Sequence, residues 1–498
     1  MKCSIIGIFA FLVFCGSAKG QENVFTNRAY WKANPSLEQV KADIAKGNDA
    51  TELNINAFDA VTWALIEKTD NAVVKYLLSL EGNGVNKLTH DGRTYIFWAA
   101  YKDNLEMMQY LFDRGAKLDV IDSHGYSVLN FAATTGQLNT KLYDFLIERG
   151  ADPKSEVSNA GANALLLVAP FMKDDSLINY FKNKGVSLNS KDDKGNGIFN
   201  YAARRGNIDL LDKLIKLGVD YKTPNKEGGN AFIFASQGTR GHSNTLKTYK
   251  YLESLGIQPN VTTDDGFTPL HALAFNNKDL DIFDYFIAQG VDLNQPDMNG
   301  NTAFTNAAGR NNFSTLKHLV GYVNDINAAN AKGQTALMRA VRYNSAEVVT
   351  FLLNQGADAT AKDNAGNSLA YYLIGGYNSD KTDIYNSKFT ALSAAGLDMN
   401  ETQSAGDTLW HLAVKANDLD LLKELTKCNI PINQKNSEGL TPLHLAAMKA
   451  QDADILKFLI AQGADKNSKT DFDESVFDLA AENELLNQQN IPLNFLKI

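Results

Sequence analysis

The chain has 498 residues, of which 44% are apolar and 21% charged, and its formal net charge is −9 at pH 7. This composition is typical of a folded protein and excludes a disordered chain. The acidic balance also argues against nucleic acid as a general partner, because phosphate backbones are bound by basic domains.

The first twenty residues have the features of an export signal. Lys2 supplies a positive start, residues 5–14 are apolar, and Ala18 belongs to a small-residue cleavage site. We therefore expect residues 1–20 to be a signal peptide and the mature protein to be periplasmic or secreted. Residues 12–16 also resemble a bacterial lipoprotein cleavage box, so a lipid anchor on Cys15 is the alternative. No later apolar run is long enough for a membrane span.

Cysteine usage leaves little room for disulfide chemistry. Cys3 and Cys15 lie in the first segment, so that Cys428 stands alone in the mature chain. No intramolecular disulfide is then expected. We expect a buried, unreactive thiol at Cys428, because only Lys427 nearby favours a thiolate.

Residues 21–58 are predicted to form an N-terminal helical cap. Two helices are expected, at about residues 26–32 and 35–46, and the second one ends at Gly47. Asp59 then begins the first full unit of a repeated pattern, with an apolar helix around Trp63.

The clearest copy of that pattern spans residues 437–467. Gly439 marks a turn, Thr441 is a good N-cap, and Pro442 occupies the first helical position, where its missing N–H costs nothing. A second helix is predicted from Asp454, with Ile455, Phe458 and Leu459 on its buried face, and Gly463 ends it. Two short helices with single apolar stripes cannot bury their own faces, so the unit needs copies stacked on both sides.

Turn glycines recur along the chain, mostly 33 or 34 residues apart. They are Gly92, Gly125, Gly161, Gly195, Gly228, Gly266, Gly300, Gly333, Gly366, Gly406 and Gly439. A period near 33 with a turn and two helices resembles the ankyrin repeat. The residues that carry the resemblance are Thr268-Pro269-Leu270-His271, Thr441-Pro442-Leu443-His444 and the partial match Thr408-Leu409-Trp410-His411, with the closing tripeptides at 150–152, 356–358 and 463–465.

The resemblance implies an all-α ankyrin-repeat solenoid of stacked helix-turn-helix units with short β-hairpin-like turns. We expect about twelve units over residues 59–471 and a C-terminal cap repeat over residues 472–498. Two units carry insertions, near residues 238–242 and residues 375–382, at the turn between their helices. Inserted loops in solenoids are often binding surfaces, but they also arise by drift.

No catalytic or metal-binding motif stands out in the sequence. The seven histidines show no metal-ligand spacing with cysteine or with one another, and no nucleophile elbow, zinc-protease or nucleotide-binding pattern occurs. We therefore expect no enzymatic activity, no cofactor and no metal. At His271, His411 and His444 the resemblance implies that each imidazole ties adjacent turns together.

The resemblance also implies a binding groove, lined nine and ten residues after each turn glycine. Counted from the first unit, these pairs are Lys68-Thr69, Tyr101-Lys102, Thr134-Thr135, Pro170-Phe171, Arg204-Arg205, Gln237-Gly238, Phe275-Asn276, Gly309-Arg310, Arg342-Tyr343, Gly375-Gly376, Lys415-Ala416 and Met448-Lys449. Eight of these 24 residues are basic and none is acidic, whereas chain-wide usage would place about two basic and about three acidic residues there.

Twelve of these positions form what we call the candidate stripe. Its members are Tyr101, Lys102, Arg204, Arg205, Phe275, Asn276, Arg310, Arg342, Tyr343, Lys415, Met448 and Lys449. One interpretation is a basic groove with apolar anchors, which would take an acidic surface or segment of a protein partner. The other is helix capping, since any helix C-terminus favours cations by about 0.3–1 kcal/mol.

Two functions are consistent with these features. The first is a protein-interaction scaffold that acts outside the cytoplasm, in an exported bacterial protein that is a monomer and binds one partner along its groove. The alternative is a secreted effector or inhibitor that binds a target protein of another cell or host. The residues alone do not separate the two.

Overall fold

The computed structural model describes residues 23–497, so the expected signal peptide and Cys15 lie outside the described residues. Within residues 23–497 the regular structure consists of α-helices and short 3-10 helices, and no named strand occurs. Isolated antiparallel bridges join Lys191 to Gly197, Thr239 to His242 and Lys469 to Ser475. The all-α repeat fold is thereby confirmed.

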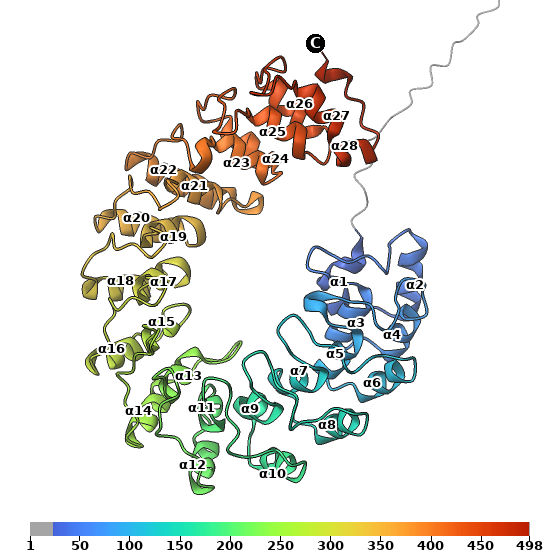
Figure 1. Ribbon diagram of the computed structural model, residues 1–498, viewed down its shortest axis with the longest axis vertical. Coiled ribbons are helices and arrows are strands. Elements are labelled where there is room, and N and C mark those ends of the chain that lie inside the picture. The colour runs from blue at the N-terminus through green and yellow to red at the C-terminus, as the bar shows by residue number, and fades with distance from the viewer. Residues whose placement is uncertain (1–22, 498) are drawn as a thin grey trace, which may run out of the picture. The chain divides into compact units, whose positions relative to one another are not determined.

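Helices α1 to α28 follow one another as pairs (Figure 1). The first helices are α1 (Arg28–Lys32), α3 (Ala60–Glu67), α5 (Tyr95–Tyr101), α7 (Val128–Thr134), α9 (Ala164–Val168), α11 (Ile198–Ala203), α13 (Ala231–Gln237), α15 (Pro269–Leu273), α17 (Ala303–Arg310), α19 (Ala336–Tyr343), α21 (Leu369–Ile374), α23 (Leu409–Lys415), α25 (Pro442–Lys449) and α27 (Val476–Glu482). The second helices are α2 (Leu37–Ala45), α4 (Asn71–Leu77), α6 (Leu105–Phe112), α8 (Thr140–Ile147), α10 (Ser176–Asn183), α12 (Ile208–Lys216), α14 (Leu246–Ser254), α16 (Leu280–Ala288), α18 (Phe313–Leu319), α20 (Ala346–Asn354), α22 (Thr382–Ala394), α24 (Leu419–Leu425), α26 (Asp454–Ala461) and α28 (Glu484–Gln488).

Short 3-10 helices occupy some of the connections. They are η1 (Val24–Thr26), η2 (His90–Gly92), η3 (Ala169–Phe171), η4 (Val320–Tyr322), η5 (Ser379–Lys381), η6 (Ser404–Gly406) and η7 (Asn494–Leu496).

The first helices are buried on nearly every side. In α5, every residue from Tyr95 to Ala100 is buried. The reason is that a first helix inside a unit packs against the first helices of the preceding and following repeats as well as against its own second helix, as α5 does against α3, α7 and α6. Small residues such as Ala99 and Ala100 allow this close approach, so the core of each unit consists largely of its stacked first helices.

The unit at residues 437–467 shows how the sequence builds one repeat. The Thr441 hydroxyl accepts a hydrogen bond from the backbone N–H of His444 at the start of α25, where Pro442 is the first residue. Gly439 and Gly463 have φ of 73° and 96°, the left-handed values that glycine adopts without strain. Both helices and both turns therefore lie where the residues predict them.

One detail of this unit differs from the expectation. Spacing alone places Phe458 in the buried face of α26, but the fully buried residues are Ile455, Leu456 and Leu459, and Phe458 is only half-buried. The apolar stripe of α26 is wider than the face that α25 and its neighbours cover. Phe458 lies at the edge of that face.

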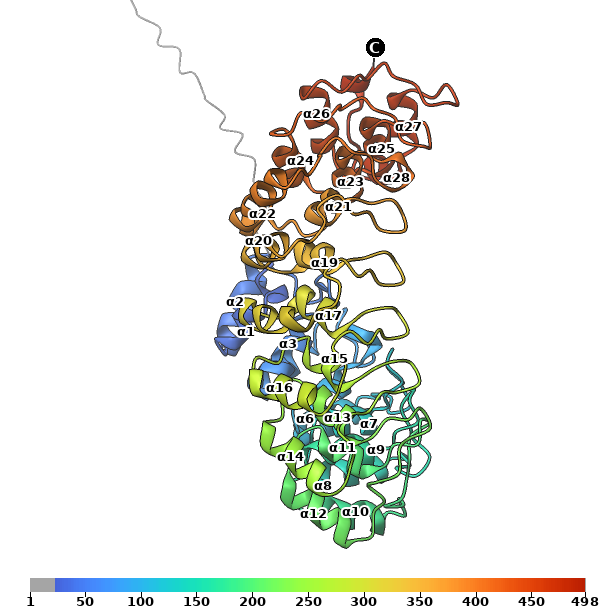
Figure 2. The same cartoon turned by 90° about the vertical axis from the view of Figure 1, so that its left-hand side faces the viewer.

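The chain divides into two compact units by its internal contacts. Unit 1 comprises the described residues up to Ala202 together with Asp212–Val219, and unit 2 comprises Ala203–Leu211 and the residues from Asp220 onward. In unit 1, helices α1 and α2 pack on α3 and α4 in the same manner as a repeat packs on its neighbour. In unit 2, the connecting loops between repeats project on one side of the helices (Figure 2).

Both insertions belong to unit 2. Residues 238–242 form a tight turn closed by the bridge between Thr239 and His242. The second insertion is not only a loop, because after Gly376 it contributes η5 and the start of α22, which with 13 residues is the longest helix of the described chain. This insertion therefore changes which residues meet the preceding repeat.

Candidate functional site

The candidate stripe lies where each first helix ends and the chain turns into the second helix. Tyr101, Arg310, Tyr343, Lys415 and Lys449 are the last residues of α5, α17, α19, α23 and α25. The expected register of nine and ten residues after the turn glycine thus brings the stripe to equivalent points of successive repeats. Within each unit, the stripe residues at these helix ends form the candidate site.

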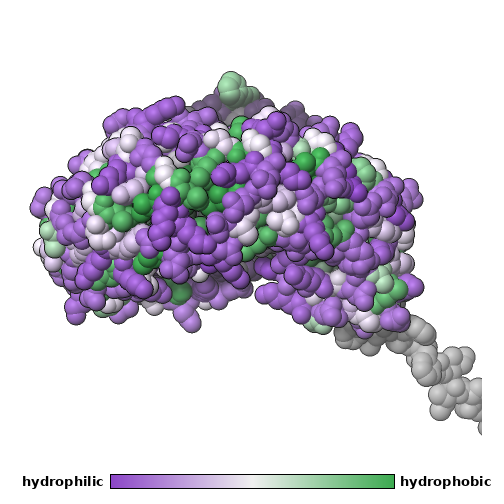
Figure 3. All heavy atoms as spheres, turned by 90° about the horizontal axis from the view of Figure 1, so that it is seen from below, coloured by the Kyte–Doolittle hydropathy of each residue, from purple (hydrophilic) through white to green (hydrophobic). Residues whose placement is uncertain are grey.

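Every residue of the candidate stripe reaches solvent. Tyr101, Lys102, Arg204, Arg205 and Arg342 are half-buried, and the other members are exposed. Among the apolar members Phe275, Tyr343 and Met448 are 36%, 60% and 45% exposed. On the face of the molecule drawn in Figure 3, hydrophilic side chains predominate and hydrophobic ones gather in patches between them.

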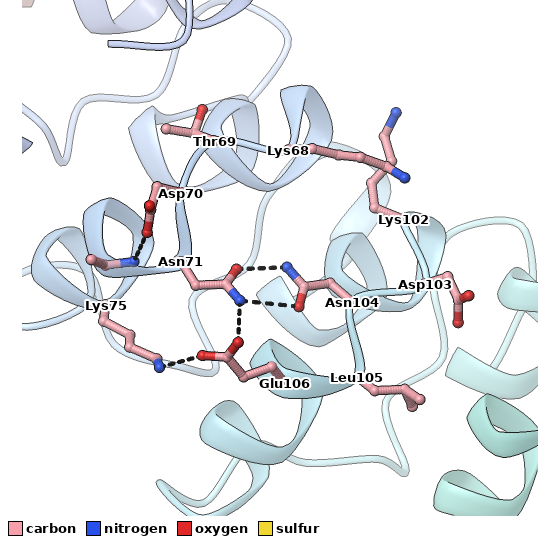
Figure 4. A pocket seen from close by; sticks show the side chains of 11 residues that line it. Lys68, Thr69, Asp70, Asn71, Lys75, Lys102, Asp103, Asn104, Leu105 and Glu106 are labelled. Atoms are coloured by element: carbon pink, nitrogen blue, oxygen red, sulfur yellow. Dashed lines mark hydrogen bonds and ion pairs between the residues drawn. The ribbon is translucent and has the colours of Figure 1, made fainter. Parts of the chain in front are cut away.

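In unit 1 the stripe borders a hollow of about 660 Å³ between the turns of two repeats. Its lining includes three lysines and three carboxylates, namely Lys68, Lys75, Lys102, Asp70, Asp103 and Glu106. Asn71 and Asn104 link the two repeats, with Nδ2 of Asn104 2.7 Å from Oδ1 of Asn71 (Figure 4). The charges in this hollow are therefore balanced.

Lys75 and Glu106, which both line this hollow, form an ion pair with each other. Nζ of Lys75 lies 2.5 Å from Oε1 of Glu106, and this contact lowers the pKa of the Glu106 carboxyl. The pKa of Lys102 is lowered, mainly by burial; Glu67 opposes this effect, and Lys68 and Arg28 add to it. Its Nζ lies 4.6 Å from the centre of the Tyr101 ring. Lys102 is thus a cation held against an aromatic face.

In unit 2 a second hollow, of about 320 Å³, lies at the equivalent turns of α12 and α14. Arg205, Lys247 and His242 line it together with the single carboxylate Asp209. The first insertion contributes His242 to its wall, and Ser243 directly follows, so this insertion reaches the candidate stripe. The neighbouring Arg204 guanidinium lies 5.0 Å from the centre of the Phe234 ring.

A third hollow, also in unit 2 and of about 210 Å³, adjoins Arg342 and Tyr343. Its lining residues come from the end of α19, from α21, from the second insertion and from α22, and they include Lys381 and Lys388 but no aspartate or glutamate. The insertion therefore adds cations to the stripe at this point. Nothing in the spacing of the repeats indicates Lys388.

Lys415 of the stripe forms an ion pair inside its own repeat. Nζ of Lys415 forms an ion pair with Oδ2 of Asp407, whose side chain is 4% exposed. Asp407 directly follows the turn glycine of its own repeat, so it lies outside the positions nine and ten residues after that glycine. Lys415 therefore contributes less positive charge to the surface than its position predicts.

The three helix-start histidines are structural. In each, Nδ1 accepts a hydrogen bond from the backbone N–H of the preceding threonine, and Nε2 faces a backbone oxygen of the following loop 2.9–3.0 Å away. The imidazoles of His271, His411 and His444 are fully buried, and burial lowers the pKa of each. Each ring is therefore a neutral bridge between turns, as the resemblance implied.

Asparagine side chains form a second set of bridges, which the sequence analysis missed. Nδ2 of Asn311 donates to the backbone oxygens of Ala274 and Asn277 at 2.9 and 2.8 Å. Nδ2 of Asn344 donates in the same way to Ala308 and Asn311, and Asn483 does so near the C-terminus. We call these contacts asparagine ties. Their 33-residue recurrence between Asn311 and Asn344 is the signal that could have revealed them.

The described residues offer no arrangement typical of metal binding or thiol catalysis. Residues 23–497 contain no group of three or more His, Cys, Asp and Glu side chains placed to hold a metal ion. Burial and the nearby Glu424 raise the pKa of the half-buried Cys428 thiol. The helices in this part of the chain all lack the length and apolar content that crossing a bilayer requires.

Comparison with known families gives a clear result. A family described as "Ankyrin repeats (3 copies)" matches residues 46–157, 199–297, 240–327, 270–363 and 366–470, which is more than half of the chain. The chain belongs to the ankyrin repeat family. Ankyrin repeats generally mediate protein–protein interaction, and the fold is typically a non-enzymatic scaffold.

Individual relatives of this ankyrin repeat protein are distant. Alpha-latroinsectotoxin-Lt1a of Latrodectus tredecimguttatus is 25% identical over 82% of this chain and 29% of its own length. A putative ankyrin repeat protein of Acanthamoeba polyphaga mimivirus is 24% identical over 64% of this chain and 44% of its own. The chain thus spans less than half the length of these two relatives.

A solved structure also matches part of the chain. The crystal structure of the human ASB11 ankyrin repeat domain shares 23% sequence identity, covers 44% of this chain and 96% of its own, and superposes with a TM-score of 0.38. A bacterial origin for this chain stays a prediction, since the relatives named above are viral and animal.

Proposed function

We propose that this protein is a non-enzymatic, monomeric scaffold that acts outside the cytoplasm and binds a protein partner through the candidate stripe. The partner presents an acidic surface or an extended acidic segment. Charge attraction steers this encounter, and the exposed apolar members of the stripe anchor the complex.

The observation that carries this proposal is the excess of cations at one register position in a protein of net charge −9. Arg310 and Lys449 are exposed, and Arg342 and Arg205 are half-buried beside hollows of the surface. The helix dipole favours cations at these helix ends. It does not account for exposed apolar side chains such as Phe275 and Met448 beside them.

The charge distribution favours unit 2 as the binding unit. In unit 1 the hollow beside Lys102 has as many carboxylates as lysines. In unit 2 the hollow beside Arg205 has one carboxylate, and the hollow beside Arg342 has none. An acidic segment would thus meet its strongest attraction between α12 and α25.

The extracellular location rests on the apolar segment at residues 5–14 and its cleavage site. Lipid attachment at Cys15 is the competing outcome. A secreted effector or inhibitor is the alternative function, and its support is the similarity to a protein whose name identifies it as a toxin. Fractionation of cells that express the full chain separates these outcomes, because they place the protein in the periplasm, in a membrane or in the medium.

Affinity capture tests the proposed function. The mature chain is used to capture partners from an envelope extract, alongside a variant with Arg204, Arg205, Arg310 and Arg342 each changed to Glu. The matched control changes four exposed cations outside the stripe to Glu, namely Lys250, Lys317, Lys332 and Lys457.

We expect the wild-type chain and the control to capture the same protein and the stripe variant to lose it, with unchanged circular dichroism. Equal capture by the stripe variant would show that its cations only cap helices.

A further inference from the structure

The second insertion replaces an asparagine tie with a lysine. Asn311 and Asn344 hold the backbone oxygens of Ala274 and Ala308, which occupy the same position in successive repeats. The next oxygen of this series belongs to Val341, and Nζ of Lys388 in α22 donates to it at 2.8 Å. In the next repeat, the amine of Lys388 therefore takes the place that the amide of Asn344 has in the preceding one. The contact is buried.

The amine of Lys388 has unused hydrogen-bonding capacity. Its side chain is buried, with the residue 4% exposed, and an ammonium group has three N–H donors. In the described part of the chain the backbone oxygen of Val341 is the one acceptor recorded for it, and no carboxylate pairs with it. Burial lowers the pKa of Lys388 to about 8. A charged Lys388 therefore lacks a counter-ion in the free protein.

The space beside Lys388 is lined by further donors. We call it the α19–α22 pocket; it is the hollow of about 210 Å³ described above beside Arg342 and Tyr343. Arg342 and Lys381 supply two more cations, and Asn344, Asn378, Tyr343 and Tyr385 supply polar groups. Nε of Arg342 is buried without a hydrogen-bond partner among the described residues, and its guanidinium lies 5.4 Å from the centre of the Tyr343 ring.

We propose that the α19–α22 pocket binds one carboxylate group of the acidic partner segment, held by Lys388 and Arg342 with Lys381 at the rim. This proposal rests on the proposed function and assigns it one specific contact. Buried donors without acceptors cost free energy, so an oxyanion that fills the pocket satisfies groups that the chain leaves unpaired. A carboxylate side chain also fits a cavity of this volume.

The simpler interpretation is that Lys388 serves only as a substitute for the asparagine tie. That role needs one hydrogen bond to Val341 and no charge, since Asn344 performs it in the preceding repeat with a neutral amide. Lys388→Gln separates the two interpretations. The glutamine keeps an N–H donor near Val341 and removes the charge that a bound carboxylate requires.

Binding of a carboxylate has a proton signature. A bound anion favours the charged amine, so Lys388 takes up a proton when a ligand binds at about pH 8. The other titratable groups that line the pocket are Arg342, Lys381, Tyr343 and Tyr385. Burial raises the pKa of Tyr385, and the tyrosine therefore stays neutral at this pH.

Four carboxylates lie on α22 and on the elements near it and could also affect the pKa of Lys388. They are Glu347 of α20, Asp380 of η5, Asp383 of α22 itself and Glu424 of α24. None of them contributes to the lowered pKa of Lys388, which comes from burial alone. The proton uptake therefore reports on Lys388.

Calorimetric titration of the full mature chain with a blocked hexaglutamate peptide tests the proposal, in two buffers of different ionisation enthalpy at about pH 8. We expect the wild-type chain to bind with proton uptake. Lys388→Gln should weaken binding at least about tenfold and abolish the uptake. Lys381→Gln, an exposed rim position that does not threaten folding, should weaken binding by a smaller factor. The exposed Lys317→Gln is the control and should change nothing.

Three outcomes would overturn the proposal. The first is that the peptide fails to bind the wild-type chain. The second is that Lys388→Gln binds with unchanged affinity and proton uptake; if Arg310→Glu then abolishes binding, only the pocket is excluded and the proposed function stands. The third is that inorganic phosphate displaces the peptide more effectively than glutarate at equal ionic strength, which would assign the pocket to phosphate.

Discussion

His444 joins its own repeat to the next one, because its Nε2 lies 2.9 Å from the backbone oxygen of Ser468. Its Nδ1 accepts a hydrogen bond from the backbone N–H of Thr441 at 3.1 Å. Only the neutral imidazole with its proton on Nε2 can make both contacts. His271 and His411 make the same pair of contacts, so the stability of unit 2 depends on three neutral histidines.

The first prediction concerns pH. Burial lowers the pKa of all three imidazoles in the folded chain, so the unfolded chain binds more protons as the pH falls through about 6.5. The free energy of unfolding should be highest above that pH and should decrease below it. Urea denaturation at several pH values between about 7.5 and 5.5 measures this decrease.

Thr305 provides the control for this measurement, because it fills the histidine position in the repeat of α17. A variant with His271, His411 and His444 each changed to Thr should lose most of the pH dependence in this range. If the dependence is the same in the variant, other groups cause it.

The second prediction concerns the packing of α25. Leu443 is fully buried, so Leu443→Ala should lower the free energy of unfolding by roughly 2–5 kcal/mol. Phe458→Ala should cost less than a fully buried phenylalanine would, because Phe458 is half-buried. Since repeats couple mainly to their neighbours, hydrogen exchange should accelerate first in the C-terminal repeats. A uniform loss of protection along the chain would contradict this expectation.

The third prediction concerns the asparagine ties. Asn311→Ala removes both hydrogen bonds to Ala274 and Asn277 and leaves those carbonyls without a donor. We expect a loss of about 1–3 kcal/mol for each carbonyl that water cannot reach. Asn276→Ala, at an exposed position, should change the free energy of unfolding by less than about 0.5 kcal/mol. Equal effects in denaturation would show that the ties do not stabilise the stack.

The fourth prediction concerns the turn that admits the second insertion. A Cβ on Gly376 would lie 2.4 Å from the backbone oxygen of Arg342, whereas a Cβ on Gly375 would meet its nearest neighbours at 3.3 Å. Gly376→Ala should therefore destabilise the protein by about 1–3 kcal/mol and displace the loop from Arg342. Gly375→Ala should cost less. Thermal denaturation compares the two, and equal melting temperatures would refute the close approach.

Much of the fold follows from short-range signals in the sequence. Thr441, Pro442 and Gly463 act through their own backbone geometry, so they mark helix ends without knowledge of the neighbours. Phe458 shows the limit of such signals. Spacing of three and four residues identifies an apolar side of α26, but the packing of α25 decides whether Leu456 or Phe458 is covered.

The positions of the stripe residues in each repeat could be predicted from the sequence, but their contacts with other side chains could not. Counting from the turn glycines located Arg310 and Arg342, because each repeat places its first helix alike. The same count missed Asp407, which lies at the start of the repeat and forms an ion pair with Lys415. It also missed Lys388, because the second insertion shifts the register and only the bounds of α22 reveal which residue reaches Val341.

The most direct test of the central claim is the salt dependence of partner binding. The dissociation constant of the captured partner is measured between about 50 and 500 mM salt, for the wild-type chain and the four-site stripe variant. We predict that wild-type binding weakens steeply with salt and that the residual binding of the variant is nearly independent of salt. Wild-type binding that is unchanged over this range would contradict the claim that the stripe recognises an acidic partner.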